Sequence, residues 1–269
     1  QIAIRALRAA RELGYSVASV YSTIDRDQKH LKLSDEAICI GPPETKDSYL
    51  NEAAIISAAE LSGADAIYPG FGFLAENASF AEKCRESGFK FIGPDPEVIA
   101  IMGDKIKAKE LAKSLNIPVV PGYEGEISTE NEAIKIVEEI GYPVIIKASA
   151  GGGGRGMRVV NSSDELWQSI QSAQNEAELA FGDGKIFIEK YLKKPRHIEV
   201  QIFGNGKGEA VHLFTRDCSL QRKYQKIIEE APALNIDNQK LEEIQNLSVE
   251  ACKKLNYEGA GTIEFLYEN

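Results

Sequence analysis

Four consecutive glycines, at positions 151–154, stand between two segments of β-forming residues, 142–146 and 157–160. Glycine has no Cβ, so this backbone can adopt positive φ angles and lie directly against a ligand. Lys147 precedes the glycines and Arg155 follows them. Exposed backbone N–H groups beside cationic side chains suit phosphate oxygens. We therefore predict a flap that closes over a nucleoside triphosphate.

Two better-known glycine motifs fit this segment poorly. A P-loop needs Gly-Lys-Ser/Thr at the start of a helix, and no lysine follows these glycines. Gly151, Gly153 and Gly156 match the spacing GxGxxG, but that motif also requires a following helix, whereas 157–160 is typical of a strand. A flexible hairpin tip without a ligand is the competing interpretation of the glycines taken alone, and the flanking charges count against it.

Two lysines and one strand end are further candidates for contacts with a nucleotide. Lys105 and Lys147 lie on separate predicted elements, so their ammonium groups could grip different phosphates of one nucleotide. The segment 189–192 follows the β-forming segment 186–188 and offers acceptors, donors and backbone groups suited to adenine. The competing interpretations are solvated surface lysines and an exposed, charged strand end.

The composition limits the classes of protein to which this chain can belong. The chain has 269 residues, 43% hydrophobic and 27% charged, which predicts a packed core in one large domain or two. Its net charge of -10 argues against a nucleic-acid-binding groove, and no apolar stretch is long enough to span a membrane. The four cysteines are widely scattered, so we expect reduced thiols in a cytoplasmic protein rather than disulfides or a zinc site.

The organisation expected along the chain starts with an α/β segment. Helix and strand patterns alternate through residues 1–93, which predicts a parallel, doubly wound sheet. We expect a helical connector at residues 94–118 and a smaller unit with the glycine flap at 119–191. A mainly β segment is expected at 192–269. The chain starts inside a helix without Met or an N-cap and stops where a strand enters a turn. We expect a fragment that lacks, among other parts, the first strand of the doubly wound sheet.

The expected helices are 2–13, 52–61, 79–85, 97–102, 105–115, 130–140, 164–180 and 240–254. The expected strands are 16–21, 37–40, 66–68, 89–92, 144–147, 157–160, 185–189, 197–203, 210–215 and 260–267. Within 197–203, the apolar Ile198, Val200 and Ile202 alternate with Glu199, Gln201 and Phe203. Ser162 and Ser163 are N-cap candidates for the helix 164–180.

Eight motifs together carry a resemblance to a known family. They are GFGFLAEN at 70–77, MGDK at 102–105, IKASAGGGGRGM at 146–157, EKYL at 189–192, PRHIE at 195–199, RDCSLQR at 216–222, QKIIEEAP at 225–232 and GAGTIEF at 259–265. In order, and over essentially the whole chain, they resemble the biotin carboxylase family within the ATP-grasp enzymes. No single motif would be specific, but the set is.

The resemblance implies a fold and an activity. The fold is a Rossmann-like domain at 1–93 that lacks its first strand, then an ATP-grasp lid at 119–191 and part of the larger antiparallel ATP-grasp subdomain at 192–269. The activity is that of an ATP-dependent carbon–nitrogen ligase, in which ATP and bicarbonate give carboxyphosphate and the carboxylate then passes to N1 of biotin on a carrier protein. Implied partners are ATP, Mg²⁺ or Mn²⁺, bicarbonate, the biotin carboxyl carrier, a carboxyltransferase subunit or domain, and a second copy of the chain. Arg8 and Glu12 lie on a helix resembling the family's dimer face; nucleic acid and membrane are not expected partners.

The resemblance also assigns roles residue by residue. The implied nucleotide contacts are Lys105 and Lys147 at phosphates, Gly153 and Gly154 in the flap, Glu189, Lys190 and Leu192 at adenine, and His197, Gln221, Tyr224 and Leu266 nearby. Lys226 matches the family's bicarbonate lysine, and Glu264 matches the first of two magnesium-binding glutamates. Lysines, flap N–H groups and a carboxylate are the parts that phosphoryl transfer needs. Ile263 and Phe265 should face the core, which turns Glu264 to the opposite face of its strand.

Several positions depart from the family pattern. Tyr224 stands where many relatives carry His or Asn, Tyr68 and Phe71 replace a usual His and Tyr, and Gln1 replaces a Glu. Phe71 lacks the hydroxyl that the family places near bicarbonate and biotin. The second magnesium glutamate and the general-base glutamate would lie beyond residue 269, so we expect the chain as given not to carboxylate biotin. The alternatives are another ATP-grasp ligase, of the carbamoyl-phosphate or purine-pathway type, and a non-catalytic nucleotide-binding module.

Overall fold

The computed structural model describes residues 2–123, 125, 127–148, 157–181, 184–222 and 225–268. The chain forms two compact units. Unit 1 comprises Gln1–Ile117, Glu199–Arg216 and Ala231–Ile263, and unit 2 comprises Pro118–Ile198, Asp217–Glu230 and Glu264–Asn269. Each unit therefore combines segments that are distant in the sequence. The domain boundaries expected from the sequence stay predictions.

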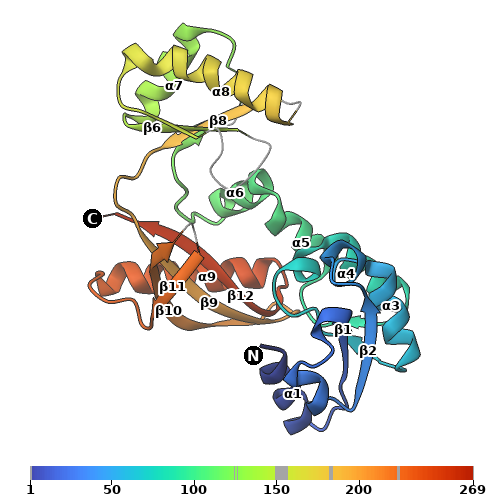
Figure 1. The fold of residues 1–269 in the computed structure, drawn as a ribbon. Helices are drawn as coiled ribbons and strands as arrows, with labels where there is room; N and C mark the ends of the chain where they lie inside the picture. Colours follow the sequence, from blue (N-terminus) through green and yellow to red (C-terminus); the bar gives the residue numbers. More distant parts are fainter. Residues whose placement is uncertain are drawn as a thin grey trace. The chain divides into compact units, whose positions relative to one another are not determined.

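Unit 1 begins with the predicted alternation of helices and strands (Figure 1). Its elements are α1 (Ile2–Glu12), β1 (Ala18–Ser22), α2 (Lys29–Leu33), β2 (Glu36–Gly41), α3 (Glu52–Leu61), β3 (Ala66–Ile67), α4 (Ala78–Glu86) and β4 (Lys90–Phe91). β1 pairs in parallel with β2, and β3 with β4. The α/β class is confirmed. In the described residues, however, the parallel strands form two separate two-stranded sheets instead of one continuous sheet.

Local signals in the sequence explain where these helices start. The side chains of Asn51 and Asn77 cap α3 and α4 by accepting hydrogen bonds from the backbone N–H groups of Ala54 and Phe80. Phe80 is buried and meets Phe91 of β4 edge to face, with ring centroids 6.2 Å apart. The caps thus set the start of each helix, and the aromatic pair ties α4 to β4.

Two helices follow in the predicted connector. α5 (Pro96–Gly103) has a proline in its first turn, where the missing N–H leaves no hydrogen bond unmade. α6 (Lys105–Ser114) comes directly after it, and Oδ1 of Asp104 accepts a hydrogen bond from the N–H of Lys107 at 3.2 Å. Lys105 is therefore the first residue of a helix.

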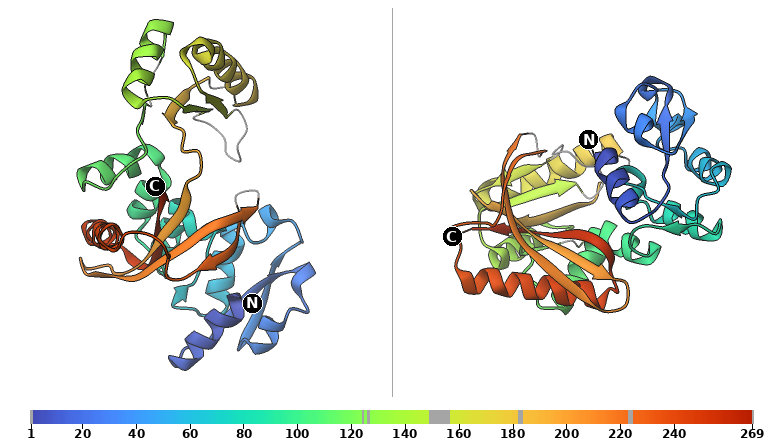
Figure 2. Two further views of the ribbon diagram at one scale, coloured as in Figure 1. Left: turned by 90° about the vertical axis from the view of Figure 1, so that its left-hand side faces the viewer. Right: turned by 90° about the horizontal axis from the view of Figure 1, so that it is seen from below.

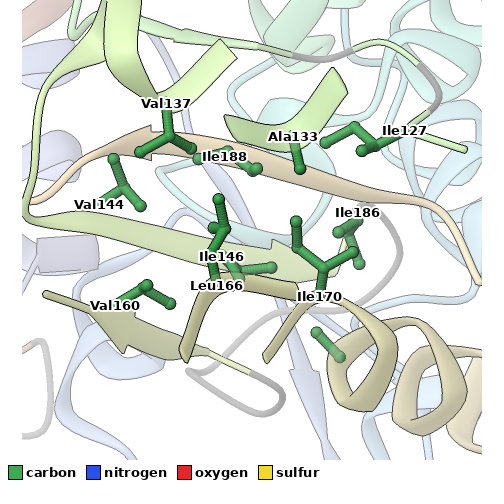
Figure 3. Close-up of a cluster of buried hydrophobic side chains, with 11 residues drawn as sticks. Ile127, Ala133, Val137, Val144, Ile146, Val160, Leu166, Ile170, Ile186 and Ile188 are labelled. Carbon is green, nitrogen blue, oxygen red and sulfur yellow. The ribbon is translucent and has the colours of Figure 1, made fainter. Parts of the chain in front are cut away.

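Unit 2 contains a four-stranded antiparallel sheet covered on one face by two helices (Figure 1). The strand order is β5 (Gly122–Tyr123), β8 (Ile186–Lys190), β6 (Val144–Ala148) and β7 (Arg158–Val160), and the helices are α7 (Glu130–Ile140) and α8 (Leu166–Phe181). Figure 3 shows the apolar side chains of the strands and helices meeting in one core. Val137, Ile146 and Ile170 are fully buried there. The predicted bounds of α7 are confirmed, because the side chain of Thr129 caps it.

The start of α8 differs slightly from the prediction. Residues Ser163–Glu165 form a 3-10 turn, and the helix begins at Leu166 rather than at position 164. Ser162 is the N-cap residue of that turn, but its side chain makes no capping hydrogen bond. A 3-10 turn is common at the N-terminus of an α-helix. Similar short turns occur at Thr23–Asp25, Thr45–Asp47 and Phe73–Glu76.

A second four-stranded sheet has the order β11 (Gln225–Glu230), β10 (Ala210–Arg222), β9 (Arg196–Asn205) and β12 (Glu258–Tyr267). The predicted alternation along β9 places Ile198, Val200 and Ile202 in the interior, where they are buried, but it fails at Glu199, which is buried between them. Helix α9 (Asn238–Lys254) lies along one face (Figure 2). A Cβ at Gly204 would lie 2.9 Å from Sγ of Cys252 on α9 and would collide with the carbonyl oxygen of Tyr257 just after the helix, so glycine is needed for this close packing.

Two general expectations can be compared with the described residues. Cys39, Cys84, Cys218 and Cys252 are all free thiols, as predicted. None of the helices in the described ranges combines the length and apolar character that crossing a bilayer requires.

Candidate functional site

Four of the predicted site residues come together in unit 2 on four neighbouring strands. His197 lies on β9, Gln221 on β10, Lys226 on β11 and Glu264 on β12. Gln221 and Lys226 are direct partners in the β10–β11 ladder. Glu264 is 51% exposed, between the half-buried residues on either side of it. The predicted alternation thus holds in the structure, and it turns Glu264 away from the apolar face.

The carboxylate of Glu264 is the centre of this group, which we call the β-sheet cluster (His197, Gln221, Lys226 and Glu264). Nζ of Lys226 lies 2.7 Å from Oε1 of Glu264, and the Lys226 side chain is 28% exposed. Nε2 of His197 lies 3.3 Å from the same oxygen. A cation and an imidazole therefore share one carboxylate oxygen in a partly solvated setting.

The orientation of the His197 ring is set by Gln221. The amide nitrogen of Gln221 lies 2.8 Å from Nδ1 of His197 and also donates to the carbonyl oxygen of Cys218 at 2.9 Å. An amide N–H can only donate, so Nδ1 accepts and the proton of the neutral ring is on Nε2. Nε2 is buried and makes no hydrogen bond within the described part of the chain, although Glu264 is near. The contact with Glu264 is thus a close approach without hydrogen-bond geometry.

Three residues that sequence reasoning did not single out hold His197 in place. Oγ of Ser219 accepts the backbone N–H of His197 at 3.0 Å, and Ser219 itself hydrogen-bonds Asp217. Arg196 donates from Nε and a terminal nitrogen to Oδ2 of Asp217, at 3.0 and 2.7 Å. Burial alone would raise the pKa of Asp217, but the hydrogen bonds from Ser219 and Arg196 hold that pKa below its ordinary value. The motif at 216–222 was the available signal, since it contains both Asp217 and Ser219.

A second group of predicted residues lies on the sheet of unit 2 that is formed by β5, β8, β6 and β7. Nζ of Lys147 on β6 is 2.6 Å from Oε2 of Glu189 on β8, with the side chains 31% and 12% exposed. The same ammonium lies 5.6 Å from the ring centroid of Phe187, its partner in the ladder. Lys147 is therefore held over the strand that carries the predicted adenine-reading segment.

Lys190 and Leu192 are placed differently from each other. Nζ of Lys190 donates to the carbonyl oxygens of Gly141 and Tyr142, at 3.0 and 2.7 Å, just after the end of α7. Its ammonium thus stabilises the chain at the C-terminal end of a helix, where a cation is favoured. Leu192 follows β8 and is half-buried. The adenine contact implied for these two residues stays a prediction.

The remaining predicted residues fall in three classes. Gly153, Gly154 and Tyr224 lie outside the described residues. Lys105 begins α6 in unit 1, whereas Lys147 belongs to unit 2, and the side chain of Lys105 is outside the described part. Leu266 is 52% exposed and lies two residues after Glu264, so both side chains are on one face of β12.

A buried ion pair in unit 1 was also missed by sequence reasoning, which assigned Glu199 to the polar side of an alternating strand. Glu199 is 1% exposed. Nε of Arg216 lies 2.6 Å from Oε1 of Glu199, and Arg216 also donates to Oε1 of Gln201 at 2.8 Å. A charge can be buried in this way only because it is paired.

The donor set of the β-sheet cluster fits a magnesium nucleotide. Glu264 offers an exposed carboxylate, a ligand type that Mg²⁺ prefers. His197 has a buried Nε2 that makes no hydrogen bond with the described residues and that a ligand oxygen could satisfy. Lys226 adds a positive charge suited to a small anion.

Comparison with known proteins identifies the family. Residues 1–99 match the family model described as "Biotin carboxylase, N-terminal domain", and residues 104–269 match "Carbamoyl-phosphate synthase L chain, ATP binding domain". The chain is 54% identical over 270 residues to the biotin carboxylase of Pseudomonas aeruginosa, a match that covers 100% of this chain and 60% of that protein. The chain belongs to the biotin carboxylase family.

Solved structures of family members have the same fold. A biotin carboxylase–β-γ-ATP complex from Campylobacter jejuni is 49% identical, with a TM-score of 0.87, and the match covers 98% of this chain and 59% of that one. The biotin carboxylase domain dimer of the Hydrogenobacter thermophilus 2-oxoglutarate carboxylase, in complex with MgADP, ADP and bicarbonate, is 46% identical with a TM-score of 0.84; that match covers 98% and 58%. The chain thus spans about three fifths of the length of these biotin carboxylase relatives.

Proposed function

We propose that the protein catalyses the ATP-dependent carboxylation of biotin with bicarbonate, the first half-reaction of a biotin-dependent carboxylase. The observation that carries this proposal is the convergence of Lys226 and His197 on one carboxylate oxygen of Glu264. The ammonium of Lys226, which can bind an anion, thereby lies next to the carboxylate of Glu264, which can bind a metal ion. The ligands of the C. jejuni and H. thermophilus relatives, a β-γ-ATP, MgADP and bicarbonate, support the same chemistry.

Each residue has a role in this proposal. Glu264 holds Mg²⁺, which neutralises charge on the nucleotide when bound. Lys226 binds the bicarbonate that becomes carboxyphosphate, before its carboxylate passes to N1 of biotin. Lys147 binds a phosphate of ATP, and the Nε2 proton of His197 donates to the nucleotide. Positioning and charge neutralisation account for most catalysis of phosphoryl transfer, so these groups must be held rigidly. The strand ladders and the link from Asp217 through Ser219 to His197 provide that rigidity.

The setting of the reaction is part of the proposal. A carrier protein or domain would present biotin, and a carboxyltransferase subunit or domain would receive the product. The dimer of the H. thermophilus domain supports a homodimer. The free cysteines fit a reducing compartment, which we propose is the cytoplasm.

A chimaeric enzyme tests the function directly. Residues 1–269 would replace the matching 60% of the P. aeruginosa biotin carboxylase, and phosphate release from ATP would be measured with bicarbonate and free biotin. We expect release that requires bicarbonate, is stimulated by biotin and is lost in Lys226→Met. Release that depends on ammonia or glutamine instead would favour a carbamoyl-phosphate type of ligase. A chimaera that binds a fluorescent ATP analogue but shows no turnover would support a non-catalytic nucleotide-binding module and overturn the proposal.

A further inference from the structure

A cavity of about 550 Å³ lies in unit 1, and it is lined by none of the site residues described above. Its walls come from β10, from the connection between β11 and α9, and from the first three turns of α9. Cavities of 300 to 1,000 Å³ are typical of sites for small molecules. None of the residues that line it belongs to the β-sheet cluster or to the Lys147–Glu189 pair.

Phe214 at the wall of this cavity has a strained backbone. Its φ is +63°, a left-handed conformation that is unfavourable for a residue with a Cβ. The strain breaks the alternation of β10, so that Leu213 and Phe214 are both exposed. Phe214 is 66% exposed, although an aromatic side chain is stabilised by burial. The backbone thus holds an aromatic ring at the cavity instead of against the sheet.

Neighbouring contacts fix this arrangement. The N–H of Phe214 donates to Nδ1 of His212 at 3.3 Å, and the two rings meet edge to face with centroids 5.5 Å apart. Since Nδ1 accepts, the proton of the neutral His212 ring is on Nε2 and is a donor for a ligand. Next to them, Oγ1 of the buried Thr215 accepts the N–H of Ala233 at 3.2 Å, which ties the β11–α9 connection to β10.

Helix α9 presents hydrogen-bonding groups to the same cavity. Asn238, Leu241 and Gln245 line it and recur at helical spacing on one face, together with Asn246. Each carboxamide offers both a donor and an acceptor, which suits the edge of an amide-like group. The apolar side chain of Leu241 lies among them on the same wall.

The charge of the cavity restricts what it can hold. Among the described residues that line the cavity, Glu242 is the one charged side chain, and none is a lysine or an arginine. An anionic ligand such as a phosphate or carboxylate would meet a carboxylate without any compensating cation. A cationic ligand would instead be attracted by Glu242.

We propose that this cavity is a second, non-catalytic binding site for a small aromatic ligand that is uncharged or cationic and carries amide- or amidine-type groups. The ring of Phe214 stacks on the ligand, the carboxamides of α9 bind its polar edge, and Glu242 selects for positive charge. The site is separate in residues and chemistry from the anion-binding cluster of unit 2.

A series of three probes of one shape tests the proposal. Benzamidine, benzamide and benzoate differ mainly in charge, and each would be titrated into the chain while ¹H–¹⁵N NMR shifts are recorded. We expect benzamidine to bind most tightly, benzamide next and benzoate not at all, with shifts at the lining residues of β10 and α9. Binding of none of the three, or benzoate binding as tightly as benzamidine, would overturn the proposal.

Two variants and a control sharpen the result. Glu242→Gln should reduce the preference for benzamidine over benzamide by about tenfold, as loss of a charge-assisted hydrogen bond does. Glu243→Gln changes an exposed neighbour on α9 that does not line the cavity, and should leave the preference unchanged. Phe214→Gly should remove binding of all probes without lowering the Tm, because glycine tolerates positive φ. Retained binding in that variant would contradict the role of the ring.

Discussion

The ammonium of Lys226 and the carboxylate of Glu264 form an ion pair, with Nζ 2.7 Å from Oε1. The family resemblance assigns these residues to different ligands, bicarbonate for Lys226 and magnesium for Glu264. In the structure the charge of each side chain is instead paired with that of the other. A metal ion that binds Oε1 of Glu264 would therefore compete with Lys226 for that oxygen, and its binding would release the lysine for an anion.

This competition predicts opposite effects of two substitutions on metal affinity. Glu264→Gln removes the carboxylate and should weaken Mn²⁺ binding by at least about tenfold, since even groups that only orient metal ligands contribute that much. Lys226→Met should strengthen it by about 1.4-fold to fivefold, because a partly exposed ion pair is worth ~0.2–1 kcal/mol. Binding of Mn²⁺ with an ATP analogue, measured by electron paramagnetic resonance, checks both.

A matched control lies on the same strand. Glu258 on β12 pairs with Lys90, also at 2.7 Å, so Glu258→Gln removes a similar ion pair from residues outside the proposed site. Its Mn²⁺ affinity should equal that of the unmodified chain. Weaker Mn²⁺ binding in Lys226→Met would show that the lysine supports the metal and would contradict the competition.

The Lys147–Glu189 pair yields a prediction that separates phosphate from base recognition. Lys147→Met removes the ammonium and should weaken ATP binding about tenfold or more, since a hydrogen bond to a charged group is worth ~1.5–3 kcal/mol. Adenosine has no phosphates, so its affinity should not change. Fluorescence titration with labelled ATP and labelled adenosine measures both, and Lys194→Met, at an exposed position in the same unit, is the control. Equal losses for ATP and adenosine would assign Lys147 a structural role.

Strong local signals explain how much of the fold could be predicted. The helix 130–140 is confirmed at both ends because it has a threonine cap and a regular apolar stripe. The strand β11 was missed because all six of its residues are exposed, so its sequence has no alternation of apolar and polar residues. It forms through its ladder with β10, a partner that local patterns do not reveal.

The candidate site likewise contains some features that the sequence predicts and others that it does not. The alternation around Glu264 and the motif containing Gln221 could be recognised in the sequence, and in the structure both residues lie next to His197. The burial of Glu199 was not readable, because an alternating strand normally turns such a residue to solvent and only its distant partner Arg216 makes burial tolerable. Local sequence patterns reveal residue types, but they do not reveal which residues pair with each other across the fold.

The core of unit 2 can be tested through its centre. Ile146 is fully buried in β6, between β8 and β7 (Figure 3). Ile146→Ala should lower the free energy of unfolding of unit 2 by about 2–5 kcal/mol, because it removes apolar contacts and leaves a cavity. Trp167 packs against this core and is the one tryptophan in the chain, so its fluorescence during urea unfolding reports on unit 2. Leu179→Ala, at a position 90% exposed, should change the midpoint little, and an equal loss there would argue against a packed core at Ile146.

Asp25 in unit 1 predicts a dependence of stability on pH. The hydroxyl of Tyr49 donates to Oδ2 of Asp25 at 2.6 Å and that of Ser22 at 2.8 Å. These hydrogen bonds, that from Tyr49 first, hold the pKa of Asp25 below its ordinary value of 3.8. The unfolded chain therefore binds the proton more readily, so the stabilisation is complete above pH 3.8 and is lost as the pH falls through the lower folded pKa.

Asp25→Asn should lower the free energy of unfolding by about 1 kcal/mol at pH 7, and the Tm difference from the unmodified chain should shrink below pH 4. The exposed Asp27→Asn is the control; a Tm difference for Asp25→Asn that stays constant from pH 7 to pH 3 would show that the charge of Asp25 contributes nothing to folding.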